Sequence, residues 1–140
     1  MANFNLAIDK VIKSEGGYIY DPDDAGGETI FGISRRANPN WLGWKIVDKV
    51  KKEHPVDYKK LLNNNIELLN KAKLLYKQKY WDVMELDDIP SQKLAFQMFD
   101  TAVNMGVSKA ISITQRLLGM TATGKWNEET KTNLMNYKHG

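Results

Sequence analysis

The chain begins with an apolar stripe that has the period of one helix face. Apolar residues recur at three-and-four spacing at Phe4, Ala7, Ile8, Val11 and Ile12. The same spacing reaches Glu15, and two glycines, Gly16 and Gly17, follow at once as a helix stop. The pattern predicts a helix that ends at Glu15 and leaves this carboxylate at the edge of a hydrophobic core.

The segment after this helix has the composition of a strand, a turn and a second strand. Aromatic and β-branched residues fill 18–20 and 29–33, and a run rich in Asp, Pro and Gly separates them. Such a run is typical of a hairpin with a longer loop. We therefore predict a small β-hairpin directly after the first helix.

The rest of the chain predicts helices that each have one apolar side. They are expected at 43–53, 65–80, 88–105, 107–118 and 128–137. Pro90 would occupy the first turn of the third of these helices, whose apolar side would run from Leu94 to Met105. Asn127 would cap the last helix, and Gly106 would join two helices in a tight helical hairpin. The expected fold class is mainly α (α+β).

Glu15 is the strongest candidate for acid–base chemistry. At a core edge, desolvation disfavours a charged carboxylate and raises its pKa, and the C-terminal end of the helix dipole acts in the same direction. Asp21, Asp23 and Asp24 lie in a polar loop that should keep them ionised. Glycoside hydrolysis uses such a pair, one carboxyl protonated and one ionised. The competing interpretation is an ordinary exposed glutamate beside a solvated turn.

Three segments resemble the signature of a known enzyme family. Residues 15–18, 26–29 and 31–34 read Glu-Gly-Gly-Tyr, Gly-Gly-Glu-Thr and Phe-Gly-Ile-Ser, with an Asp-rich stretch between the first two. This order is similar to glycoside hydrolase family 108, the N-acetylmuramidases of phage lysis systems and of bacterial secretion or release pathways. Residues 95–119 resemble the predicted peptidoglycan-binding segment of that family. The resemblance implies one lysozyme-like domain over 1–140, with a catalytic part in 1–85 and a peptidoglycan-binding-like part in 86–140.

The resemblance also implies roles for individual residues. Glu15 would be the catalytic acid. Asp24, nine positions later, and Thr29, five positions beyond, match the spacing of phage-type lysozymes that have a similar helix and hairpin. Asp24 would activate water or stabilise the cationic transition state, and Thr29 would orient the water. Family members commonly carry Asn where this chain has Ile30, which removes a polar group from the expected cleft.

Several side chains are candidates for holding the glycan. Tyr18 belongs to the signature, while Trp41 and Trp44 lie in a loop-like stretch and could stack on sugar rings. A line of polar residues with helical spacing could hydrogen-bond acetamido groups, or form an exposed face without a ligand; it consists of Gln97, Asp100 and Asn104.

Composition and charge limit which cofactors and partners the chain is expected to have. The chain has no cysteine and two scattered histidines, and the acidic loop departs from a calcium-binding pattern at Ala25 and Gly32, so we expect no metal and no cofactor. A net charge of +3, with ten lysines within 45–79, suits a polyanion such as bacterial wall. No nucleic-acid-binding motif is present, so we expect no nucleic acid partner.

The predicted function is hydrolysis of peptidoglycan glycan strands by a monomer. The chain has no apolar run typical of a signal peptide or a membrane span, so we expect synthesis in the cytoplasm and delivery to the wall by a holin or an export system. Two alternatives stay open. A lytic transglycosylase needs the glutamate but no second carboxylate, and a catalytically silent module would only bind the wall.

Overall fold

A computed structural model describes residues 1–23 and 27–137. Within these residues the chain is mainly α-helical and has one small antiparallel sheet after the first helix, which confirms the predicted lysozyme-like α+β class. Its contacts form two compact units: the sheet unit, residues 9–75, and the helical unit, residues 1–8 and 76–140. None of the helices in the described part of the chain is long and apolar enough to cross a membrane.

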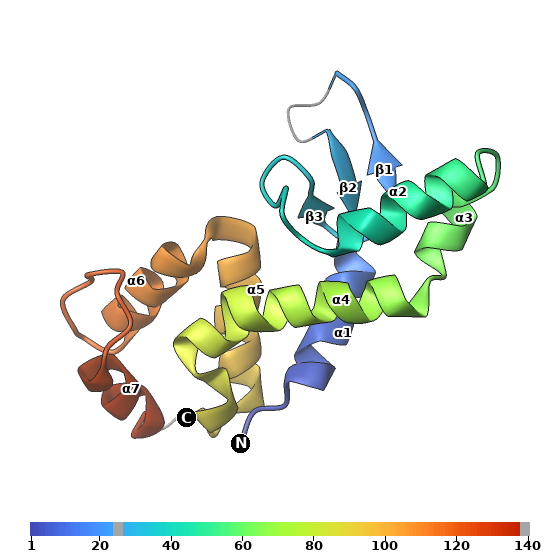
Figure 1. Cartoon of the computed structure of the whole chain (residues 1–140). Coiled ribbons are helices and arrows are strands. Elements are labelled where there is room, and N and C mark those ends of the chain that lie inside the picture. The colour runs from blue at the N-terminus through green and yellow to red at the C-terminus, as the bar shows by residue number, and fades with distance from the viewer. Residues whose placement is uncertain (24–26, 138–140) are drawn as a thin grey trace. The chain divides into compact units, whose positions relative to one another are not determined.

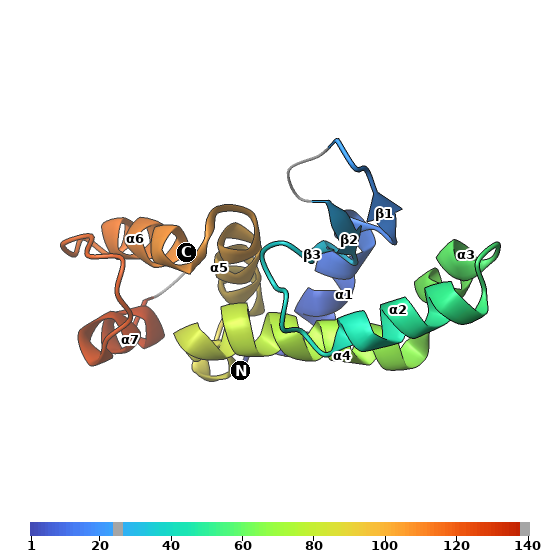
Figure 2. The same ribbon diagram turned by 45° about the horizontal axis from the view of Figure 1, so that its top comes forward.

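The sheet unit holds Glu15 and the elements that follow it in the chain. It consists of the C-terminal part of α1 (Phe4–Glu15), β1 (Ile19–Tyr20), β2 (Glu28–Ile30), β3 (Ile33–Ser34), α2 (Gly43–Glu53), α3 (Tyr58–Asn63) and, up to Leu75, α4 (Ile66–Tyr76). In both views the sheet lies beside the C-terminal end of α1 (Figure 1, Figure 2). The predicted helix over 43–53 is confirmed as α2, whereas α3 has no counterpart among the predicted helices.

The sheet has three strands in the order β1-β2-β3, all antiparallel. Ile19 pairs with Thr29, and Ile30 pairs with Ile33. Between β2 and β3 the chain turns at Phe31 and Gly32, which both have positive φ (52° and 80°), as in two-residue hairpin turns. The prediction of one continuous strand over 29–33 is therefore wrong, because this turn divides it.

The core of the sheet unit combines α1, the sheet and the following helices. Its members are nearly or fully removed from solvent: Val11, Ile30, Ile33, Trp44, Val47, Leu62, Leu68 and Ala72. Trp44 lies inside α2 and donates from Nε1 to the Asn38 carbonyl at 2.7 Å, so its predicted place in a loop is wrong. Four residues of the predicted apolar stripe of α1 are buried, namely Phe4, Ala7, Ile8 and Val11, whereas Ile12 is partly exposed.

The helical unit is built around aromatic rings and a helical hairpin. Its elements are a π-helical turn η1 (Lys77–Trp81), the short 3₁₀ turns η2 (Asp82–Met84) and η3 (Leu86–Asp88), α5 (Gln92–Met105), α6 (Val107–Leu117) and α7 (Glu128–Met135). The rings of Phe4, Trp81 and Phe99 meet edge to face with centroids 5.4–5.7 Å apart. α5 packs against α6 after Gly106, which confirms the predicted helical hairpin.

Two details of the predicted helices in this unit are wrong. The helix expected to open at 88–90 begins at Gln92, because Ser91 Oγ accepts a hydrogen bond from the Leu94 amide at 3.1 Å and acts as the cap. Met105 is 57% exposed and does not belong to the apolar side of α5. The predicted cap of α7 is confirmed, since Asn127 Oδ1 accepts from the Thr130 amide at 2.8 Å.

Candidate active site

Glu15 is the last residue of α1, and its side chain is partly exposed to solvent. Gly16 follows with φ +86°, in the left-handed region that commonly ends helices and favours glycine. The Gly16 amide still donates to the Ile12 carbonyl at 3.2 Å, which closes the last turn. The predicted end of the helix at Glu15 is confirmed.

The chain that leaves Glu15 is held by a side chain from α3. The Tyr18 amide donates to Asn63 Oδ1 at 2.7 Å. A Cβ atom on Gly17 would lie 2.7 Å from Asn63 Cγ and closer still to Oδ1, so an alanine there would collide with the Asn63 amide group. The two glycines after Glu15 therefore serve different needs: Gly16 supplies a backbone conformation, and Gly17 leaves space for Asn63.

A buried carboxylate organises the rest of this region. Glu28 of β2 is 5% exposed, and Tyr18 Oη donates to its Oε2. Lys51 Nζ of α2 lies 2.9 Å from the same oxygen, and Arg35 Nη1 lies 2.9 Å from Oε1. Arg35 also binds Asp48 through two hydrogen bonds of 2.8 and 2.7 Å. We call these five residues the Glu28 cluster.

The charges of the Glu28 cluster balance at neutral pH. Burial alone would raise the pKa of Glu28, but hydrogen bonds from Tyr18, Arg35 and Lys51 outweigh it and hold this pKa below its ordinary value. The Arg35 guanidinium likewise lowers the pKa of Asp48. Burial, together with the Glu28 carboxylate, raises the pKa of Tyr18 above its usual range. Two carboxylates thus face two cations, with neutral Tyr18 as a donor.

Aromatic rings surround the cations of the Glu28 cluster. Lys51 Nζ lies 5.4 Å from the Tyr20 ring centre and 5.8 Å from those of Tyr18 and Tyr58. The Arg35 guanidinium carbon lies 5.2 Å from the Trp44 ring centre. Contacts of this kind are favourable for partly desolvated cations, so the rings help to keep both cations at the carboxylates.

β2 presents Thr29 on the face opposite the Glu28 cluster. Successive side chains of a strand point to opposite faces, and here Glu28 and Ile30 are buried while Thr29 is partly exposed. Ile30 is completely removed from solvent. The side chain at the position where family members commonly carry Asn is therefore part of the core in this chain.

The structure describes two of the three aspartates of the predicted acidic loop. Asp24 lies outside the described residues. Asp21 and Asp23 are exposed, and Asp21 Oδ1 accepts a hydrogen bond from the Asp23 amide at 3.0 Å, which is a local turn contact. The catalytic roles predicted for Glu15, Asp24 and Thr29 stay predictions.

Tyr18 and Trp41 differ in how much surface they offer. Tyr18 is 7% exposed, its hydroxyl is engaged by Glu28, and its ring meets Tyr58 edge to face at 5.7 Å. These contacts favour a role inside the sheet unit. Trp41 is partly exposed, packs edge to face on Trp44 at 5.2 Å, and donates from Nε1 to the Lys71 carbonyl at 3.4 Å. Glycan contacts by Tyr18 and Trp41 stay predictions.

The predicted polar line lies on α5 in the helical unit. Gln97 and Asn104 are exposed and Asp100 is partly exposed. Asn104 Nδ2 donates to the Asp100 carbonyl at 2.9 Å and lies 3.3 Å from its Oδ1. A glycan contact by this line stays a prediction.

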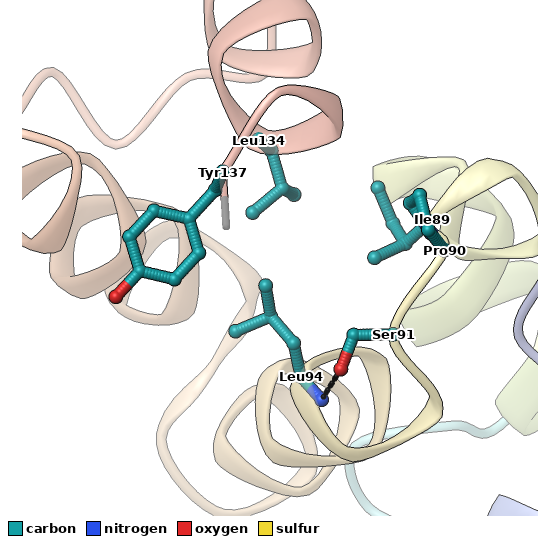
Figure 3. Close-up of a pocket in the computed structure, with 6 residues that line it drawn as sticks. All are labelled: Ile89, Pro90, Ser91, Leu94, Leu134 and Tyr137. Atoms are coloured by element: carbon teal, nitrogen blue, oxygen red, sulfur yellow. Dashed lines mark hydrogen bonds between the residues drawn. The ribbon is translucent and has the colours of Figure 1, made fainter. Parts of the chain in front are cut away.

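The helical unit also contains a small hollow between the start of α5 and α7. Figure 3 shows its lining, which is mostly apolar: Ile89, Pro90, Ser91, Leu94, Leu134 and Tyr137. Its volume is about 230 Å³, below the range of about 300–1,000 Å³ that is usual for ligand sites. The hydroxyl of Ser91 is already used to cap α5, so the hollow offers little polar recognition.

Residues that sequence reasoning missed come from distant parts of the chain. Asn63, Lys51 and Asp48 lie on α2 and α3, whose side chains reach the hairpin only after folding. Glu28 lies within the predicted signature, but its burial depends on these partners.

A partly exposed glutamate at a helix end, followed by a small antiparallel sheet, is the arrangement expected of the lysozyme-like glycoside hydrolases. Residues 8–106 match the family model described as Glycosyl hydrolase 108, and the chain belongs to this family. Membership supports the coarser prediction from the sequence, a lysozyme-like peptidoglycan hydrolase. The match ends at residue 106, and the peptidoglycan-binding character of the C-terminal part stays a prediction.

A solved structure of SagA from Brucella abortus is similar to the chain. The two share 24% identity with a TM-score of 0.64, and the alignment covers 96% of this chain and 70% of that one. At this level of identity the likeness shows the fold. No curated protein matches the chain.

Proposed function

We propose that the chain is an N-acetylmuramidase that cleaves the β-1,4 bond between N-acetylmuramic acid and N-acetylglucosamine in peptidoglycan. The observation that carries the proposal is the placement of Glu15 in a chain of the glycosyl hydrolase 108 family. Glu15 is partly exposed at the end of α1, and Gly16 and the Asn63 contact fix the backbone that follows. A general acid needs such a fixed and accessible position, because it must meet the leaving oxygen in a set geometry.

In this proposal Glu15 protonates the glycosidic oxygen as the bond to the sugar breaks. Asp24 activates a water molecule or stabilises the cationic transition state. Thr29, on the partly exposed face of β2, orients that water through its hydroxyl. Together these roles need one carboxyl group that is protonated and one that is ionised, as glycoside hydrolysis requires.

Digestion of purified peptidoglycan, followed by mass analysis of the fragment ends, tests this proposal. We expect fragments with reducing N-acetylmuramic acid ends. Reducing N-acetylglucosamine ends would place the cleavage at the other glycosidic bond. Anhydro ends would indicate a lytic transglycosylase, and binding without release would indicate a wall-binding module.

Replacement of Glu15 by Gln tests the assignment of the acid. The substitution keeps the size and shape of the side chain but removes the transferable proton, so turnover should fall by about 100-fold to 10,000-fold. Glu53→Gln is a matched control, because Glu53 is an exposed glutamate at the last position of another helix, α2. A folded Glu15→Gln protein that keeps more than a tenth of wild-type turnover would contradict the assignment.

A further inference from the structure

We propose that Glu28 is a positioning residue that fixes β2 and thereby Thr29. This inference rests on the proposed function, in which Thr29 orients the attacking water. Glu28 is opposite Tyr20 in the β1–β2 pair, at the end of the pairing next to the segment that carries Asp24 in the sequence. Its side chain can therefore hold β2, one of the two strands of the β1–β2 hairpin, in place.

Three separate parts of the chain converge on Glu28. Tyr18 comes from the segment between α1 and β1, Lys51 from α2, and Arg35 directly follows β3. The Arg35 amide also donates to the Glu28 carbonyl at 2.9 Å, so this residue pair is joined through both backbone and side chain. A shift of β2 relative to α2 or to the neighbouring strands would have to break contacts of this carboxylate.

The geometry argues against Glu28 as a reacting group. Both carboxylate oxygens are occupied, Oε2 by Tyr18 and Lys51 and Oε1 by Arg35. The residue is 5% exposed, so neither water nor a sugar has room to approach it. Its effect on catalysis must therefore pass through the backbone it anchors.

A buried carboxylate can fix the orientation of a strand through directional hydrogen bonds, which a buried apolar side chain cannot do. Replacing buried ion pairs by apolar residues of similar size is often neutral or stabilising, so stability alone does not explain the cluster. Ile30, two residues further on the same face of β2, already supplies an apolar anchor. The directional hydrogen bonds of Glu28 add a fixed orientation of the strand, which Thr29 needs if its hydroxyl is to hold a water.

The test is the kinetics of Glu28→Gln on peptidoglycan at a temperature where wild type and variant are both folded. We expect kcat to fall by about 10-fold to 100-fold while KM changes less than about twofold, because small misplacements of catalytic groups cost up to about 100-fold. Lys51→Met added to Glu28→Gln restores the charge balance and should recover part of kcat. Asp9→Asn, which breaks an exposed ion pair with Lys73 in the same unit, is the matched control and should leave kcat unchanged.

Several results would overturn the proposal. One is a folded Glu28→Gln protein with kcat within twofold of wild type, and another is a loss carried by KM alone. If Glu28→Gln does not fold, Asp48→Asn replaces it, since this outer member of the cluster is 54% exposed; an unchanged kcat would then count against the proposal.

The proposed function can fail separately from the inference about Glu28. If the wild type releases nothing from peptidoglycan, the proposed function fails. The positioning of Thr29 is then judged by NMR of its methyl group, which should shift in Glu28→Gln and not in Asp9→Asn. An unshifted Thr29 methyl resonance would refute the positioning role.

Discussion

Replacement of Gly17 by Ala tests the contact that holds the chain next to Glu15. The new Cβ would lie 2.7 Å from Asn63 Cγ, so the amide group of Asn63 must move. That movement breaks the 2.7 Å hydrogen bond from the Tyr18 amide to Asn63 Oδ1. The backbone of Gly17 is not among those with positive φ, so an alanine can adopt its conformation without strain of that kind.

Two opposing contributions set the size of the effect on stability. Loss of the hydrogen bond should cost about 0.5–1.5 kcal/mol of unfolding free energy. An alanine in place of a glycine restricts the unfolded chain and returns about 0.4–1 kcal/mol. The net effect in the wild-type background is therefore small, between a gain of about 0.5 kcal/mol and a loss of about 1 kcal/mol.

The effect of Gly17→Ala is most informative when it is measured both in the wild type and in an Asn63→Ala protein. In an Asn63→Ala protein the collision and the hydrogen bond are both absent, so Gly17→Ala should stabilise by about 0.4–1 kcal/mol. Removing Asn63 should thus make the effect of Gly17→Ala more favourable by about 0.5–1.5 kcal/mol, the contribution of the hydrogen bond that the wild type loses. Gly16→Ala is the matched control, because Gly16 has φ +86° and no atom within 4 Å of a Cβ position. Its cost of about 1–2 kcal/mol should be the same in both backgrounds.

Urea denaturation of the wild type, the single variants and the double variants measures these free energies. Turnover on peptidoglycan should fall in Gly17→Ala and in Asn63→Ala, because both release the turn that follows Glu15. An equal effect of Gly17→Ala on the free energy of unfolding in both backgrounds would refute the idea that Asn63 explains the second glycine.

Three further predictions concern the carboxylates of the sheet unit. Asp24→Asn should lower turnover far more than Asp21→Asn or Asp23→Asn, and equal effects of the three would contradict the choice of Asp24. The mechanism should be inverting, with the carboxyl groups of Glu15 and Asp24 roughly 6.5–9.5 Å apart in an experimental structure; a β-configured first product by NMR would exclude inversion. The lowered pKa of Glu28 should stabilise the fold above the ordinary glutamate pKa of about 4.3, and this stability should be lost as the pH falls through the lower folded value. Thermal melts of wild type and Glu28→Gln measure it, and an unchanged difference between them across the acid range would contradict it.

Elements whose cause is local could be predicted from the sequence. The end of α1 at Glu15 follows from an apolar stripe and a glycine, and the cap of α7 follows from Asn127. The predicted start of α5 is wrong because two helix-start signals compete within two residues. Pro90 suits a first turn, but Ser91 satisfies a backbone amide with its side chain, and the helix begins after it. α3 has six residues, too few for a period to be recognised.

The candidate site shows the same division between local and long-range causes. Glu15 could be found because its surroundings are encoded within a few residues, whereas Asn63 is 45 residues away from the amide it binds. The burial of Glu28 could have been inferred from the sequence, since residues two apart on a strand share a face and Ile30 is plainly apolar. A carboxylate on that inner face requires cationic partners, because an unpaired buried charge is very costly. The lysine-rich segment that begins at residue 45 could supply them, but only the packing of α2 against the sheet selects Lys51.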